Sequence, residues 1–179
     1  LGLKDLPFCW GEIEECGKDP LENARQKALA YYRICGQPVF SQDSGLYIEG
    51  LPKERQPGVH VRRVNGVNLT DEQMRKYYKK IAAEFGGRCV AQYQNAICLV
   101  FSENEIYEAR GGTLNWKKFW LMTEERPQRM EGFPLDAICA DYRTGRHFYD
   151  GEATMPEEEG DGVRDFFRNA LKQDRKSVV

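Results

Sequence analysis

The chain has 179 residues, of which 41% are hydrophobic and 12% aromatic, enough for one domain with a buried core. Its 26 basic and 28 acidic residues nearly balance, which argues against a nucleic-acid-binding protein or one that adheres to anionic membranes. No apolar run reaches the roughly 20 residues of a membrane span. We therefore expect a single domain over residues 1–179 that binds a small molecule, with no nucleic-acid or membrane partner.

The six cysteines are irregularly spaced and form no Cys-x-x-Cys pair. We interpret them as reduced thiols, with a zinc or disulfide role as the less favoured alternative, because no histidine lies at a metal-finger spacing from them. The chain does not open with the charged-then-apolar pattern of a signal peptide. We therefore expect a cytoplasmic protein. We interpret the two histidines, His60 and His147, as surface or turn residues.

The first predicted helix begins after Asp19-Pro20 and ends at Gly36. Asp19 is a suitable N-cap, proline is favoured in the first turn, and glycine is a common terminator. Asn23 and Lys27 are four residues apart, so they share a face that differs from the apolar stripe of the helix. That face is available for chemistry.

A strand is predicted next, in two apolar halves, residues 39–41 and 46–48. The polar run Gln42-Asp43-Ser44-Gly45 separates the halves, which predicts an interruption where a ligand can approach the backbone. A second helix is predicted over residues 70–85, since Thr70 and Gln73 can form a capping box.

The second half of the chain has mainly strand-like patterns. Residues 88–101 and 105–114 predict an antiparallel hairpin, and residues 132–140 and 146–149 predict two more strands. A last helix is expected from about Val163 to Gln173, after an acidic loop. Helices alternate with strands early and hairpins follow, so the predicted class is α/β with a mixed sheet.

Five short motifs occur in a characteristic order. They are Glu15-Cys16-Gly17, Glu22-Asn23-Ala24 followed by Lys27-Ala28, Asp43-Ser44-Gly45-Leu46, Pro57-Gly58 followed by Arg62-Arg63, and Gly132 to Asp136. In this order the chain resembles the inosine triphosphate pyrophosphatase family, which has an acidic residue before a glycine, then E-N-A-x-x-K-A, D-S-G-L and G-F-G-Y-D. The resemblance implies a long twisted mixed sheet with flanking helices, two lobes around a central cleft, and a homodimer.

The residue types also fit the chemistry of that family. Cleaving a triphosphate between its α and β phosphorus atoms needs a metal held by carboxylates and a carboxylate that orients a water molecule. Glu15 and Asp43 could supply these carboxylates, while Lys27 and Arg63 could supply positive charge to the phosphates.

The resemblance assigns a role to each residue. It implies that Glu15 is a Mg²⁺ ligand, that Asp43 is a metal ligand or general base, and that Lys27 and Arg63 contact phosphates. It also implies that Ser44 and Gly45 bind the substrate, that Phe133 stacks on a purine base, and that Asp136 accepts hydrogen bonds from it. Structural alternatives remain open: Lys27 as a solvated helix lysine, Asp43 as a turn stabiliser and Phe133 as a core residue.

Three departures from the family pattern define alternative functions. The chain opens after the position of the family's first strand and T-G-N-x-x-K segment, so we expect that element to be missing. Gln42 replaces an acid found in many members, and residues 151–172 contain no clear S-H-R segment. The favoured function is hydrolysis of ITP, dITP or XTP to the monophosphate and pyrophosphate. The alternatives are a catalytically weak nucleotide-binding module of the same fold and a pyrophosphatase for another nucleotide.

Overall fold

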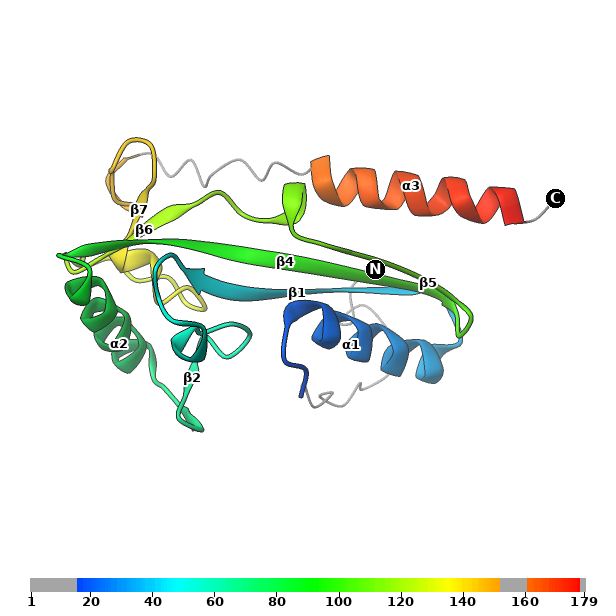
Figure 1. Cartoon of the computed structure of the whole chain (residues 1–179), viewed down its shortest axis with the longest axis horizontal. Helices are drawn as coiled ribbons and strands as arrows, with labels where there is room; N and C mark the ends of the chain where they lie inside the picture. Colours follow the sequence, from blue (N-terminus) through cyan, green and yellow to red (C-terminus); the bar gives the residue numbers. More distant parts are fainter. Residues whose placement is uncertain (1–15, 152–160, 178–179) are drawn as a thin grey trace.

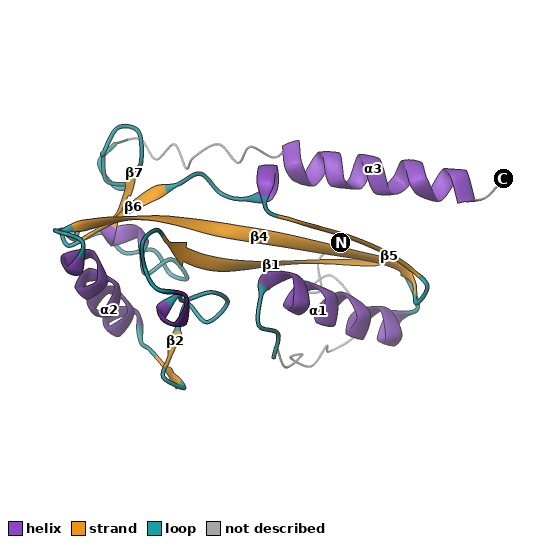
Figure 2. Ribbon diagram, viewed as in Figure 1, coloured by secondary structure: helices purple, strands orange, loops and turns teal. Residues whose placement is uncertain are grey.

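A computed structural model describes residues 16–151 and 161–177 of the chain. The helices are α1 (Pro20–Cys35), α2 (Asp71–Glu84) and α3 (Asp161–Ser177), with 3₁₀ turns η2 (Lys53–Arg55), η3 (Gly112–Leu114) and η4 (Asp136–Ile138). The strands are β1 (Val39–Ile48), β2 (Arg63–Val64), β3 (Val67–Asn68), β4 (Arg88–Ser102), β5 (Glu105–Arg110), β6 (Phe119–Met122) and β7 (Cys139–Asp141). Figure 2 shows the long strands with helices on either side of them.

The main sheet is organised around β4, which is 15 residues long. The strand order is β1-β4-β6-β7, and β5 also pairs with β4. β1 runs along one edge of β4, while β5 and β6 pair with successive stretches of the other edge, and all of these pairs are antiparallel. Strands β2 and β3 form a separate two-stranded sheet. The predicted hairpin is confirmed as β4–β5, although residues 112–114 form the turn η3 rather than strand.

Two clusters of buried side chains pack the helices onto this sheet. The larger joins α2 to β1, β4, β6 and η4, through residues such as Tyr78, Leu46 and Ile138. The smaller joins α1 to β4, through Ala24, Ala28, Cys98 and Val100. In Figure 1, α1 and α3 lie on opposite sides of the long strands, and a ring contact of 5.1 Å between Phe40 and Phe167 joins α3 to β1.

Both early helices begin as the sequence predicted. The Asp19 carboxylate accepts a hydrogen bond from the Glu22 N–H, and Gly36 ends α1 in the left-handed conformation at φ 62°. Thr70 and Gln73 form the predicted capping box at the start of α2. Local capping chemistry was therefore sufficient to place these helices.

The polar run in β1 does not interrupt the strand, contrary to the prediction. Residues 42–45 each have a β4 partner in register, from Gln42 opposite Ile97 to Gly45 opposite Gln94. Pairing with the long neighbouring strand keeps this segment extended although its residues have low strand propensity.

The strands predicted over residues 132–140 and 146–149 are largely wrong. Only Cys139–Asp141 forms a strand, residues 136–138 form η4, and a single bridge joins Ala140 to His147. Strand β6 was not predicted. The five described cysteines are free thiols, and Cys9 lies outside the described residues. No helix within residues 16–151 and 161–177 is both long and apolar enough to cross a membrane.

Candidate active site

The Asp43 carboxylate is the centre of a polar cluster between α1 and β1. The Lys27 ammonium donates a hydrogen bond to Asp43 Oδ1 at 2.8 Å, and the Asn23 amide donates one to Oδ2 at 3.2 Å. The Lys27 and Asp43 side chains are only 18% and 13% exposed, so their ion pair is partly shielded from water. Two of the sequence motifs thus meet at one point.

Asn23 also holds the chain segment that precedes α1. Its side chain is 2% exposed, and its Oδ1 accepts a hydrogen bond from the Gly17 N–H at 2.9 Å. A Cβ at position 17 would lie 2.4 Å from that oxygen, so only glycine fits here. Asn23 therefore couples the Gly17 backbone to the Asp43 carboxylate. Glu15, the predicted magnesium ligand, lies outside the described residues.

The donors suited to a metal ion in the described part of this cluster are few. Among the described residues, no group of three or more His, Cys, Asp or Glu side chains is arranged to hold a metal ion. Mg²⁺, however, is commonly held by only one or two carboxylates, with water and substrate phosphates completing its coordination. Asp43 is a hard oxygen donor of the kind that Mg²⁺ prefers, so the residues present fit such an ion.

Ser44 points to the opposite face of the strand from Asp43, because successive side chains alternate. The Ser44 hydroxyl donates a hydrogen bond to Asn95 Oδ1 at 2.7 Å, and the Asn95 amide donates to the Leu114 carbonyl at 2.6 Å. The backbone N–H of Asn95 donates to Asn115 Oδ1 at 3.0 Å. This network, centred on the buried Asn95 side chain, joins β1, β4 and the segment around the end of η3.

Gly45 permits a close approach of two backbone segments. A Cβ at this position would lie 3.0 Å from the carbonyl carbon of Gly58. Leu46 and Gly58 exchange two backbone hydrogen bonds, at 2.9 and 3.0 Å. Gly45 therefore brings the Pro57-Gly58 turn onto β1, next to the Asp43–Ser44 pair.

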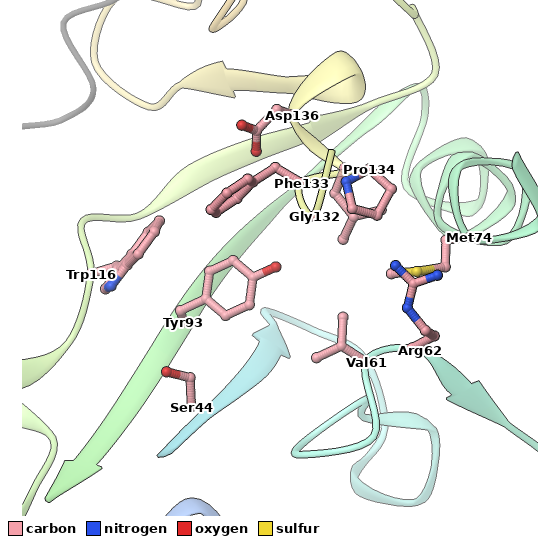
Figure 3. A pocket seen from close by; sticks show the side chains of 11 residues that line it. Ser44, Val61, Arg62, Met74, Tyr93, Trp116, Gly132, Phe133, Pro134 and Asp136 are labelled. Atoms are coloured by element: carbon pink, nitrogen blue, oxygen red, sulfur yellow. The ribbon is translucent and has the colours of Figure 1, made fainter. Parts of the chain in front are cut away.

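A cavity of about 330 Å³ opens on the Ser44 side of the strand. Aromatic and aliphatic side chains form most of its wall, together with a few polar groups, as Figure 3 shows. Its lining comprises Ser44, Val61, Arg62, Met74, Tyr93, Trp116, Gly132, Phe133, Pro134, Leu135 and Asp136. Such a mixture suits a flat, partly apolar ligand with polar edges.

Both residues predicted to contact the base, Phe133 and Asp136, line this cavity. The Phe133 side chain is 44% exposed, so it is not a core residue. Burial raises the pKa of the Asp136 carboxyl from 3.8 to about 6. Because this carboxyl titrates near neutrality, it is mostly ionised above pH 6 and mostly protonated below it.

The two consecutive arginines occupy different places. Arg63 lies on the exposed β2–β3 sheet, where its Nε donates a hydrogen bond to Asn68 Oδ1 at 3.4 Å, and it does not line the cavity. Arg62 does line the cavity, while its guanidinium pairs with Asp71 at 2.8 Å. The family resemblance assigned the phosphate contact to Arg63. The sequence pattern alone does not show which of two consecutive arginines faces a ligand.

Tyr93 and Trp116 are lining residues that sequence reasoning missed. Tyr93 lies on the same face of β4 as Asn95, opposite Leu46. Period-two alternation along the predicted strand would have placed Tyr93 on the same face as Asn95, but only the β1–β4 register brings that face to Ser44. Trp116 lies in a loop with no comparable signal.

Comparison with known proteins identifies the family. Residues 2–118 match the sequence model of the Ham1 family. The chain belongs to the Ham1 family. It is 42% identical over 72 residues to a dITP/XTP pyrophosphatase of Geobacter sulfurreducens, covering 40% of this chain and 35% of that protein. It is 31% identical over 160 residues to a dITP/XTP pyrophosphatase of Brucella melitensis, covering 83% of this chain and 66% of that protein.

Solved structures support the Ham1 fold. A dITP/XTP pyrophosphatase of Mycobacterium abscessus matches with a TM-score of 0.63 at 25% identity, over 97% of this chain and 82% of that one. A HAM1 protein of Coxiella burnetii matches with a TM-score of 0.66 at 24% identity, over 97% and 89% of the two chains. The predicted α/β fold and family resemblance are thus confirmed. The matches span 35%, 54% and 66% of the lengths of the first three curated relatives.

Proposed function

We propose that this Ham1-family chain hydrolyses non-standard purine nucleoside triphosphates such as ITP, dITP and XTP to the monophosphate and pyrophosphate. The observation that carries the proposal is the placement of Asp43 and Ser44 at consecutive positions of one strand. Asp43 belongs to the charged cluster with Lys27, and Ser44 lines the aromatic cavity. A nucleotide that spans both would have its phosphates at the cluster and its base in the cavity. Relatives named dITP/XTP pyrophosphatase support this choice of substrate.

Lys27 and Asp43 divide the work at the phosphate end. Lys27 projects from α1, and its charge would bind the triphosphate in both the ground state and the transition state. When the Lys27 ammonium pairs with phosphate oxygens in place of Asp43, the Asp43 carboxylate becomes available to orient a water molecule and accept its proton. Arg63 would contribute a further phosphate contact from the β2–β3 sheet.

Magnesium is the proposed cofactor, held by Asp43 together with Glu15. Bound there, it would neutralise negative charge on the phosphate oxygens. At the other end of the substrate, Phe133 would stack on the purine and the Asp136 carboxylate would accept a hydrogen bond from a ring N–H. Ser44 and Gly45 would line the path between the two ends. We further propose a cytoplasmic homodimer with no nucleic-acid or membrane partner.

A pyrophosphate-release assay tests the activity. The full chain is incubated with Mg²⁺ and a panel of ITP, dITP, XTP, ATP, GTP and dTTP, and both pyrophosphate and orthophosphate are measured. We expect pyrophosphate and monophosphate in equal amounts, fastest from the first three substrates. Binding without any release would support the nucleotide-binding module instead. Faster release from one of the last three would identify a pyrophosphatase for another nucleotide.

A further inference from the structure

The Tyr93 ring is held in one orientation at the side of the cavity. It stacks on Phe119, with ring centroids 5.7 Å apart and planes at 25°, and meets Trp116 edge-on at 5.4 Å. These two ring contacts restrict rotation of the Tyr93 ring. Figure 3 shows the hydroxyl end of Tyr93 pointing into the cavity. The direction of the hydroxyl is therefore set by packing before any ligand arrives.

The Tyr93 hydroxyl has no hydrogen-bond partner among the described residues. The nearby Tyr78 hydroxyl, by contrast, donates to the Val61 carbonyl at 2.9 Å, and the Ser44 hydroxyl in the cavity lining donates to Asn95. Burial raises the pKa of the Tyr93 phenol, and Cys139 and Asp136 raise it further. The group therefore keeps its proton throughout the neutral range and can donate a hydrogen bond to a ligand.

We propose that the Tyr93 hydroxyl is a specificity-determining group that donates a hydrogen bond to the 6-keto oxygen of the bound purine. The inference rests on the proposed function, in which the cavity holds the base. A 6-oxopurine presents the keto oxygen, an acceptor, next to the N1–H, a donor. The Tyr93 hydroxyl and the Asp136 carboxylate, both lining the cavity, offer the complementary donor and acceptor. Adenine in the same orientation would present a donor and an acceptor in the reverse order, leaving both protein groups mispaired.

The test combines the Tyr93→Phe variant with a change of one atom in the substrate. 6-Thio-ITP retains the N1–H but replaces the keto oxygen with sulfur, a weaker acceptor. With ITP, Tyr93→Phe should lower kcat/KM roughly tenfold, the usual effect of losing one hydrogen bond from a buried site. With 6-thio-ITP the same substitution should lower kcat/KM less than about threefold, because the Tyr93 hydroxyl donates only a weak hydrogen bond to the sulfur atom. Equal losses with both substrates, or no loss with ITP, would overturn the proposal.

Tyr78→Phe is the matched control, since it removes a neighbouring hydroxyl that already has a protein partner. It should lower the unfolding temperature while leaving the ratio of kcat/KM for ITP and 6-thio-ITP unchanged. Circular dichroism of Tyr93→Phe establishes that the variant folds.

Calorimetric titration with non-hydrolysable α,β-imido analogues of ITP and 6-thio-ITP separates this inference from the proposed activity. A wild-type chain that binds the ITP analogue but releases no pyrophosphate would refute the activity alone, and the Tyr93 comparison would then be made on dissociation constants. A wild-type chain that binds neither analogue would overturn both proposals.

Discussion

At position 43 one carboxylate satisfies two donors from α1, the Lys27 ammonium and the Asn23 amide. The structural alternative from the sequence, a carboxylate that stabilises its own turn, does not describe this arrangement, because Asp43 lies within a continuous strand. Lys27 is likewise not a solvated helix lysine, since its side chain is only 18% exposed. A partly shielded ion pair, on a strand whose next residue lines a cavity, is typical of a functional site.

Asp43→Asn and Lys27→Ala should have different kinetic effects. The asparagine keeps the shape of Asp43 but loses the charge, so we expect kcat for ITP to fall about 100-fold or more while KM changes little. Lys27→Ala should raise KM as well as lower kcat, because its charge acts on the phosphates before and during the reaction. Steady-state kinetics of pyrophosphate release measure both constants.

Glu49→Gln is a control for these variants, since Glu49 is an exposed carboxylate just beyond the end of the same strand. Its kinetic constants should match those of the wild type. Near-normal turnover of Asp43→Asn at saturating Mg²⁺ would instead exclude Asp43 as the catalytic carboxylate and favour the binding-module hypothesis.

At the scale of elements, the two early helices were predictable because their capping signals are local. Strand β1 was predicted as two separate halves. Residues 42–45 carry no local signal of their pairing with β4, the 15-residue strand that keeps them extended. The apolar run before Cys139 was misread as strand because a short apolar run also fits a buried turn such as η4. His147, interpreted as a surface or turn residue, is instead 5% exposed and forms a bridge with Ala140 of β7.

The sequence predicted the charged part of the candidate site but not the cavity. The motifs on α1 and β1 are close in sequence, and the helix period and strand pleat together bring Lys27 to Asp43. The cavity instead gathers side chains from segments far apart in the chain, such as Ser44, Tyr93 and Phe133. No local pattern specifies that convergence.

Asn95 couples several of these elements, and Asn95→Ala should be strongly destabilising. The substitution leaves the Ser44 hydroxyl and the Leu114 carbonyl without their buried partner. We expect the free energy of unfolding to fall by roughly 2–3 kcal/mol, measured by urea denaturation. Gln94→Ala, at the exposed neighbouring position, should change it by less than about 0.5 kcal/mol. Equal stabilities of the two variants would show that the network contributes little.

At the scale of the whole molecule, β4 connects the two parts of the proposed site. One end packs into the core cluster under α2 and the other into the cluster under α1. Both edges of β4 are paired, by β1 on one side and by β5 and β6 on the other. A cavity that includes the partly buried Asp136 carboxyl is thus supported by the most extensively bonded strand of the fold, which can offset the unfavourable desolvation of its charge.

Asp136 should therefore reduce the stability of the folded protein at neutral and alkaline pH. Its folded-state pKa of about 6 lies above the usual 3.8, so the proton is held more tightly in the folded state. The resulting stability is fully present below pH 3.8 and is lost as the pH rises through 6. Asp136→Asn removes the charge, so its free energy of unfolding at pH 8 should exceed that of the wild type by roughly 1–2 kcal/mol, after allowance for partial solvent exposure.

The comparison is made by urea denaturation at pH 8 and pH 4.5, and the advantage of Asp136→Asn should be much smaller at the lower pH.

Asp141→Asn serves as a control of opposite sign. The Asp141 carboxylate accepts hydrogen bonds from the Thr144 N–H and hydroxyl and from the Arg143 N–H, which lower its pKa. This variant should be less stable than the wild type at pH 8. If Asp136→Asn were also less stable there, the carboxyl would be a structural acceptor with a protein partner, and its assignment to the base of the substrate would have to be withdrawn. If instead Asp136→Asn were more stable than the wild type and had a lower kcat/KM for ITP, the Asp136 carboxyl would contribute to substrate binding at the expense of stability.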